Sequence, residues 1–128
     1  MGKEVTMFFT FWGLNIIKKE THVKTKKDFM AKMFGMMMPN SSKNLGLSKM
    51  NMVGIGSKMI RRVMKDKNIS SLEELIEQGI KSGIKMVACQ MSMDVMGITK
   101  EELLDGVEIG GVATMLSAAD DSNMSLFI

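Results

Sequence analysis

The chain has 128 residues, 45% of them hydrophobic and 24% charged, values typical of a single globular domain spanning residues 1–128. This composition excludes an intrinsically disordered chain, and no apolar run reaches the ~20 residues that a transmembrane helix needs. The net charge of +3 divides unevenly, because residues 1–67 carry 14 Lys and Arg against 4 Asp and Glu, whereas residues 68–128 carry 3 against 10.

The charge asymmetry bears on partners. The basic half can face an anionic ligand or a sister subunit, or it can be simply solvated. We expect protein partners and no nucleic acid, and contact with a membrane surface ranks below contact with a sister subunit. A single cysteine excludes an intrachain disulfide, and the amino terminus lacks the features of a secretory signal. We therefore expect a cytoplasmic protein.

The first predicted element is a strand over residues 4–11, whose continuous apolar and β-branched side chains are typical of a strand buried on both faces of a parallel sheet. Trp12 and Gly13 end this run, and residues 14–19 predict a short helix. Residues 21–27 are polar and basic and predict a loop that includes His22, the only histidine.

A methionine-rich segment follows, in which Asp28 is placed to cap a short helix that reaches Phe34. Its thioethers could form a soft site for Cu(I). No histidine or cysteine supports such a site, so we favour a pliable apolar packing segment and expect no metal. The methionines of the segment are Met30, Met33, Met36, Met37 and Met38.

Residues 40–47 predict a loop, after which Ser48 is placed to cap a helix from Lys49 to about Val63. The glycines at 54 and 56 are not interpreted as a nucleotide-binding loop, because no strand precedes them. Two capping boxes then predict helix starts, one over residues 71–74 and one over residues 99–102. The first capped helix is predicted to end at Gly83, and a strand at 84–88 and helical turns at 91–96 follow it. The second capped helix is predicted to end at Gly106. The remaining predicted elements are a strand at 107–109, a helix at 112–119 and an edge strand at 125–128.

Alternation of strands and capped helices predicts an α/β protein with a three-layer, doubly wound and mostly parallel sheet. In such sheets ligands bind beyond the carboxyl ends of the strands. The predicted site therefore gathers the segments that follow the first, second and third strands. Its candidate residues are Phe11, Trp12 and Gly13, then Cys89 with Gln90, Met91 and Ser92, and finally Gly110 and Gly111.

Cys89 is the candidate catalytic residue, because it lies where a buried strand leads into a helix. Free amides at a helix start stabilise an anion and so favour a thiolate, and Ser92 can add a hydroxyl donor. Asp94 is a candidate proton acceptor, although a surface aspartate on the helix is the simpler interpretation. The alternative for Cys89 is inert packing, since free cysteines are often buried. One cysteine and one histidine cannot close a zinc site, and no C-x-x-C motif is present.

Residues 87–97, with the sequence VACQMSMDVMG, resemble the cysteine segment of the DsrE/DsrF-like family of sulfur-relay proteins related to TusD, and are most similar to its branch of DsrE-like sulfurtransferase and peroxiredoxin-family proteins. The other segments that carry the resemblance are residues 10–14, 47–52, 110–114 and 126–128. The resemblance implies a doubly wound fold and assembly into homo-oligomers (trimers or hexamers). We expect no cofactor. Family members usually begin with a further strand and helix, so we expect this chain to lack them.

The resemblance also implies that Cys89 accepts sulfane sulfur as a persulfide from a donor protein and passes it to an acceptor. Our first hypothesis is therefore a sulfur carrier or sulfurtransferase. The second is a non-catalytic interaction subunit in which Cys89 only packs, and the third is a thiol redox sensor.

Overall fold

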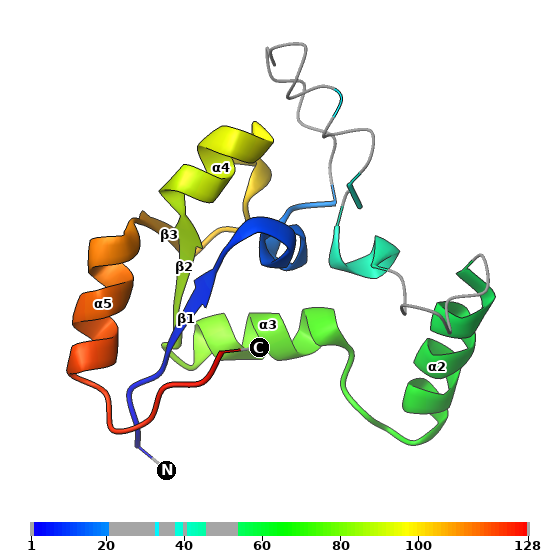
Figure 1. Ribbon diagram of the computed structural model, residues 1–128. Coiled ribbons are helices and arrows are strands. Elements are labelled where there is room, and N and C mark those ends of the chain that lie inside the picture. Colours follow the sequence, from blue (N-terminus) through cyan, green and yellow to red (C-terminus); the bar gives the residue numbers. More distant parts are fainter. Residues whose placement is uncertain (1, 21–32, 34–37, 40, 46–53, 128) are drawn as a thin grey trace.

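The computed structural model describes residues 2–20, 33, 38–39, 41–45 and 54–127 (Figure 1). Most of the predicted helix at 28–34 and the proposed cap at Ser48 lie outside these residues. The described elements are β1 (Thr6–Phe9), the 3-10 helices η1 (Phe11–Ile17) and η2 (Ser42–Asn44), α2 (Ile55–Asp66), α3 (Leu72–Lys81), β2 (Lys85–Cys89), α4 (Gln90–Met96), the 3-10 helix η4 (Lys100–Glu102), β3 (Val107–Gly110) and α5 (Val112–Asp120).

The three described strands form one parallel sheet in the order β1-β2-β3. The register sets Phe9 of β1 opposite Ala88 of β2, and Cys89 of β2 opposite Gly110 of β3. Helices flank this sheet (Figure 1). The α/β class and the parallel sheet predicted from the alternation of strands and helices are thus confirmed.

Local signals set the ends of α3 and α4. At the start of α3 the Ser71 hydroxyl accepts from the Glu74 amide at 3.2 Å, and the Ser71 amide donates to the Glu74 carboxylate at 2.7 Å, so the predicted capping box is formed. Gly83 follows α3 with a φ of +82°, and Gly97 ends α4 with a φ of +64°. Both glycines adopt the left-handed conformation that commonly terminates helices.

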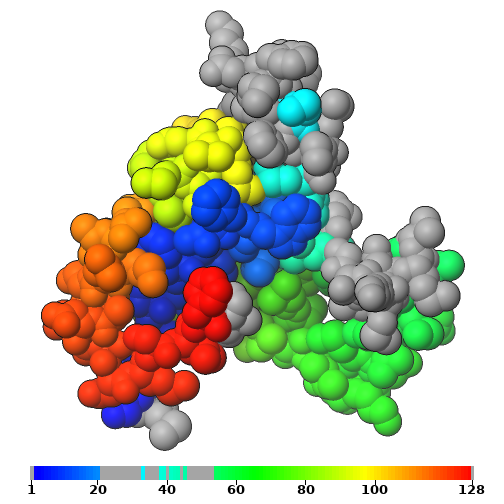
Figure 2. All heavy atoms as spheres, in the orientation of Figure 1, coloured from blue at the N-terminus to red at the C-terminus, as the bar shows by residue number. Residues whose placement is uncertain are grey.

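Two expectations about strands were wrong. The run over residues 4–11 yields only the four residues of β1, which is an edge strand of the described sheet rather than a strand buried on both faces. Met7 within β1 and Val5 just before it are exposed. Residues 125–127 form no strand and are exposed, with the red end of the chain lying on the surface (Figure 2), so that β1 and β3 are the outer strands of the described sheet.

Two expectations about helices and loops also need correction. The second capping box forms, with the Thr99 amide donating to Glu102 at 2.9 Å, but the helix it opens ends after three residues instead of reaching Gly106. Leu103 is drawn instead into an antiparallel bridge with Lys18, and the Leu104 amide donates to the Ile17 carbonyl. The predicted loop at 40–47 contains the short helix η2.

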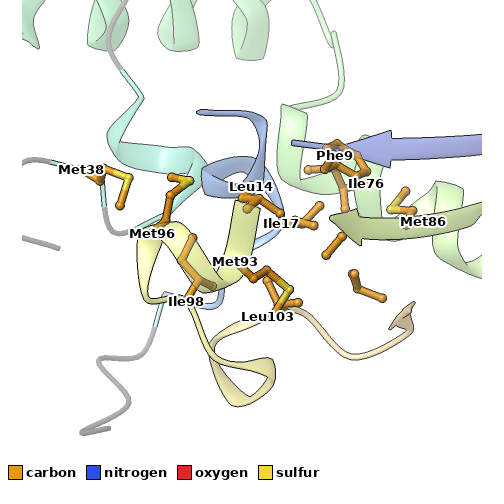
Figure 3. Packing of buried hydrophobic residues seen from close by; sticks show 12 residues of the cluster. Phe9, Leu14, Ile17, Met38, Ile76, Met86, Met93, Met96, Ile98 and Leu103 are labelled. Carbon is orange, nitrogen blue, oxygen red and sulfur yellow. The ribbon is translucent and has the colours of Figure 1, made fainter. Parts of the chain in front are cut away.

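A hydrophobic core joins β2 to α3, α4 and η1 (Figure 3). Met38 contributes to it and is buried, so this member of the methionine-rich segment packs as predicted, whereas Met33 is exposed. The other methionines of that segment lie outside the described residues. The core residues are Phe9, Leu14, Ile17, Met38, Ile76, Met86, Ala88, Met93, Met96, Ile98, Leu103 and Val107.

One ionic cluster ties α2 to α3 and η2. The Arg61 guanidinium donates to both carboxylate oxygens of Glu73, at 3.0 and 3.1 Å, and to the Ser42 carbonyl at 3.3 Å. The Ser42 hydroxyl donates to the same carboxylate at 2.8 Å. Chiefly through the hydrogen bond from Arg61, the pKa of Glu73 is lowered from 4.5 to about 2. A fork of this kind fixes the orientation of α2 as well as its position.

The Glu73 cluster makes stability depend on pH in a defined direction. Because the folded state lowers the pKa of Glu73, the stabilisation is fully present above pH 4.5 and is lost as the pH falls toward 2. We predict that Glu73→Gln lowers the free energy of unfolding at pH 7 by about 1 kcal/mol. Urea titrations should show this difference shrinking between pH 4.5 and pH 2.

The control is Glu77→Gln, which removes an exposed carboxylate that pairs with Lys81 at 2.7 Å on the same helix. We expect a much smaller effect from it, since an exposed pair contributes little. A loss of stability in Glu73→Gln that stays constant from pH 7 to pH 2 would contradict this account.

Candidate functional site

Cys89 is the last residue of β2 and the N-cap of α4, as the sequence predicted. It is a free cysteine and its residue surface is only 5% exposed. β2 is the central strand of the described sheet and has β1 and β3 on its two sides. The thiol is therefore attached to a well-fixed backbone position at the carboxyl end of the sheet.

The structure brings the three predicted segments to one edge of the sheet. Because the sheet is parallel and Cys89 pairs with Gly110, the residues that follow β1, β2 and β3 all emerge on the same side. At the end of β1 the chain turns sharply, with the Gly13 amide donating to the Thr10 carbonyl at 2.9 Å. Phe11 and Trp12 are exposed at this turn.

Phe11 adopts a φ of +41°, which is uncommon for a residue with a side chain. Strained backbone of this kind persists only where the surrounding structure holds it. Here Asn15 contributes, because its side-chain amide donates to the Trp12 carbonyl at 3.0 Å. Asn15 is fully buried, and its carbonyl oxygen has no hydrogen-bond partner within the described part of the chain. The sequence analysis missed Asn15, since an asparagine in an apolar run gave no recognisable signal.

The first turn of α4 presents its predicted residues in different ways. Gln90 and Met91 are exposed, whereas Ser92 is buried. The Gln90 side chain donates to the Asp94 carboxylate at 3.4 Å, so Asp94 is engaged on the exposed side of the helix. This placement favours the interpretation of Asp94 as a surface residue over that of a proton acceptor for Cys89.

Gly110, which pairs with Cys89, is packed too closely by its neighbours to carry a side chain. A Cβ at this position would lie 2.8 Å from Cγ1 of Val87 and 3.1 Å from the hydroxyl oxygen of Thr114. Both distances are shorter than ordinary contacts, so a side chain here would force its neighbours apart. At Gly111, by contrast, a Cβ would meet nothing within 4 Å. The sequence analysis included both glycines but missed Thr114, which lies one helical turn after Gly110.

Comparison with known proteins supports the family suggested by the cysteine segment. Residues 1–127 match the DsrE/DsrF/DrsH-like family. The chain belongs to this family. It is 49% identical over 125 residues to the uncharacterized protein YrkE of Bacillus subtilis (strain 168), a match that covers 98% of this chain and 78% of YrkE. It is 36% identical over 132 residues to the sulfur carrier protein DsrE2 of Allochromatium vinosum, covering the whole chain and 81% of that relative.

The described residues contain no group of three or more His, Cys, Asp or Glu side chains that could hold a metal ion. His22 lies outside those residues. Within the same described part of the chain, no helix is both long and apolar enough to cross a bilayer.

The two glycines of the site permit a matched test of its packing. We predict that Gly110→Ala lowers the free energy of unfolding by about 1–3 kcal/mol, because the new methyl group overpacks against Val87 and Thr114. Gly111→Ala adds the same methyl group into open space at a negative φ and should change stability by less than about 0.5 kcal/mol. Thermal and chemical unfolding of the two variants will measure the difference. Equal effects would show that the surroundings of Gly110 are not tightly packed.

Proposed function

We propose that this protein is a cysteine-based sulfur carrier or sulfurtransferase that holds sulfane sulfur as a persulfide on Cys89. The observation that carries the proposal is the position of the only cysteine, at the end of the central strand where β2 leads into α4. Membership of the DsrE/DsrF/DrsH-like family and similarity to a protein named as a sulfur carrier support a role in sulfur relay.

The chemistry requires one nucleophilic sulfur and no cofactor. The Cys89 thiol releases its proton to solvent, and the thiolate attacks the outer sulfur of a donor persulfide. A new S–S bond forms at Cys89 while the S–S bond of the donor breaks, and the donor leaves as a thiolate. Attack by an acceptor thiolate on the outer sulfur then forms the acceptor persulfide and restores the Cys89 thiolate, with no net oxidation.

The surroundings of Cys89 suit a small, sheltered product. Backbone amides of Gln90 and Met91 in the first turn of α4 can stabilise a terminal sulfur anion, and Ser92 can supply a hydroxyl donor nearby. The open space at Gly111 gives room at the same edge of the sheet. Burial of the cysteine restricts access by water and oxidants. We assign Phe11, Trp12 and Gly13 to the rim that contacts the donor and acceptor proteins.

We also propose that the protein assembles into a homo-oligomer, a trimer or a hexamer. The support is apolar surface on α5 and the segment that follows it, where no residue of α5 is buried. Clusters of exposed apolar side chains commonly mark surfaces that bind another protein. The exposed apolar residues are Val112, Met115, Leu116, Met124, Leu126 and Phe127.

One observation favours the second candidate, a non-catalytic interaction subunit. Reactive cysteines are usually partly accessible, whereas Cys89 is 5% exposed. In that case Cys89→Ala would leave assembly and partner binding unchanged, and thiol reagents would modify the protein only after unfolding. Slow but measurable alkylation of Cys89 in the folded protein would favour the carrier, because the thiol would then be reachable without unfolding.

The carrier proposal predicts a covalent adduct. Incubation with a low-molecular-weight persulfide should add the mass of one sulfur atom to the intact protein, and peptide mapping should place it on Cys89. Dithiothreitol should remove the adduct, because a persulfide is reduced by thiols. Cys89→Ser is the matched control and should gain no mass. Failure to form the adduct, under conditions that load an established carrier, would reject the proposal.

A further inference from the structure

Three exposed apolar residues lie at the edge of the sheet where Cys89 is found. Phe11 and Trp12 follow β1, and Met91 is the second residue of α4, which begins directly after Cys89. Their residue surfaces are 56%, 59% and 64% exposed. The helices η1 and α4 contact each other, and Figure 2 shows the blue and yellow-green segments side by side on the surface. We call Phe11, Trp12 and Met91 the apolar patch.

The strand register places the apolar patch beside the cysteine. Phe9 of β1 pairs with Ala88 of β2, so the next residue of the chain, Thr10, is level with Cys89. Neighbouring strands lie about 4.8 Å apart, so the turn that carries the two aromatic residues of the patch begins next to Cys89. A protein that brings its sulfur to Cys89 at this edge therefore meets the apolar patch.

The conformation of Phe11 indicates that its exposed ring has a use. With a φ of +41°, Phe11 occupies a region of backbone space that glycine adopts freely and a residue with a side chain rarely adopts. More than half of its surface is exposed, so the ring gains little from burial. Neither the backbone nor the core accounts for a phenylalanine here, and strained positions of this kind are found at functional sites.

Asn15 holds the turn that carries the two aromatic residues. Its side-chain amide donates to the Trp12 carbonyl at 3.0 Å. Asn15 is fully buried, and its neighbours in η1, Leu14 and Ile17, belong to the hydrophobic core. The exposed turn is thus anchored to the core through one buried side chain, which fixes where the apolar patch lies relative to Cys89.

The segments around the apolar patch carry no charge. Residues 10–17, 89–93 and 110–119 contain no Asp, Glu, Lys or Arg, although 24% of the whole chain is charged. Asp94 comes next along α4, and the Gln90 side chain donates to it at 3.4 Å. A charged partner would lose water at this edge without gaining a counter-charge, which costs free energy. The surface therefore fits a partner that is uncharged and apolar around its own sulfur.

We propose that the apolar patch docks donor and acceptor proteins whose reacting cysteine is flanked by uncharged apolar side chains, and that Asn15 is the positioning residue of the patch. The proposal rests on the carrier function of Cys89 and names the kind of partner that this function serves. Aromatic rings bury a large area on contact, and the flexible methionine adapts to partners of different shape. One surface can therefore serve both the donor and the acceptor.

Two short peptides test the proposal as sulfur acceptors, one with leucine and one with serine on both sides of a single cysteine. Mass spectrometry follows sulfur transfer from the persulfide-loaded full chain. We expect kcat/KM to be about tenfold higher for the leucine peptide, chiefly through a lower KM, because its flanks leave water on docking. Phe11→Gly and Met91→Ser should each bring this ratio toward one. Glycine accepts the φ of +41°, so Phe11→Gly removes the ring without straining the turn.

Trp12 is the only tryptophan, so its fluorescence reports on the patch without any sulfur chemistry. A leucine-flanked peptide with serine in place of its cysteine should shift the emission of Trp12 to shorter wavelength, and the serine-flanked counterpart should not. Asn15→Ala keeps every side chain of the patch, but it should lower both the fluorescence anisotropy of Trp12 and the ratio between the peptides. A protein that accepts no sulfur can still bind the unreactive peptide, so this proposal and the carrier proposal fail separately.

The matched control is Met59→Ser, which removes a methionine of similar exposure, 60%, from α2, and Figure 1 shows α2 far from α4. It should leave the ratio between the peptides unchanged. Three results would overturn the proposal. One is an equal kcat/KM for both peptides in the wild type. Another is an equal loss of the ratio in Met59→Ser and Met91→Ser. The third is conversion of an oligomer to a monomer by Met91→Ser, which would assign the patch to contacts between copies of the chain.

Discussion

The parallel pairing of β2 with both neighbouring strands sets the position of every candidate site residue. It fixes Cys89 opposite Gly110 and brings the segments that follow β1 and β3 to the same edge. Burial of Met86, Val87 and Ala88 anchors the strand that bears the cysteine. The sulfur of Cys89 is thus attached to a buried strand, while the turn that follows β1 exposes Phe11 and Trp12.

Burial of the cysteine is compatible with a carrier because its cargo is one atom. A persulfide extends the side chain by a single sulfur, so it needs little additional volume but gains from exclusion of water and oxidants. Gly110 is closely packed, since Val87 and Thr114 already occupy the space that a Cβ at this position would take. The site therefore combines a buried thiol with close packing at Gly110 and open space at Gly111.

Local signals in the sequence predicted much of this arrangement. The capping box at Ser71, the terminal glycines and the short apolar strands gave correct elements because each is governed by nearby residues. Failures arose where distant partners decide the outcome. Leu103 leaves its helix to pair with Lys18, and residues 125–127 do not pair with the edge of β1 or β3. The roles of Asn15 and Thr114 depend on packing that no sequence pattern encodes.

The central claim is that Cys89 receives and releases sulfur. It is tested most directly by a load-and-release experiment in which sulfane sulfur labelled with a heavy isotope is placed on the protein, the donor is removed, and an acceptor thiol is added in excess. The account predicts that the label moves to the acceptor and that the protein returns to its unmodified mass within one turnover. Label that stays on the protein, or that is found on a residue other than Cys89, would contradict it.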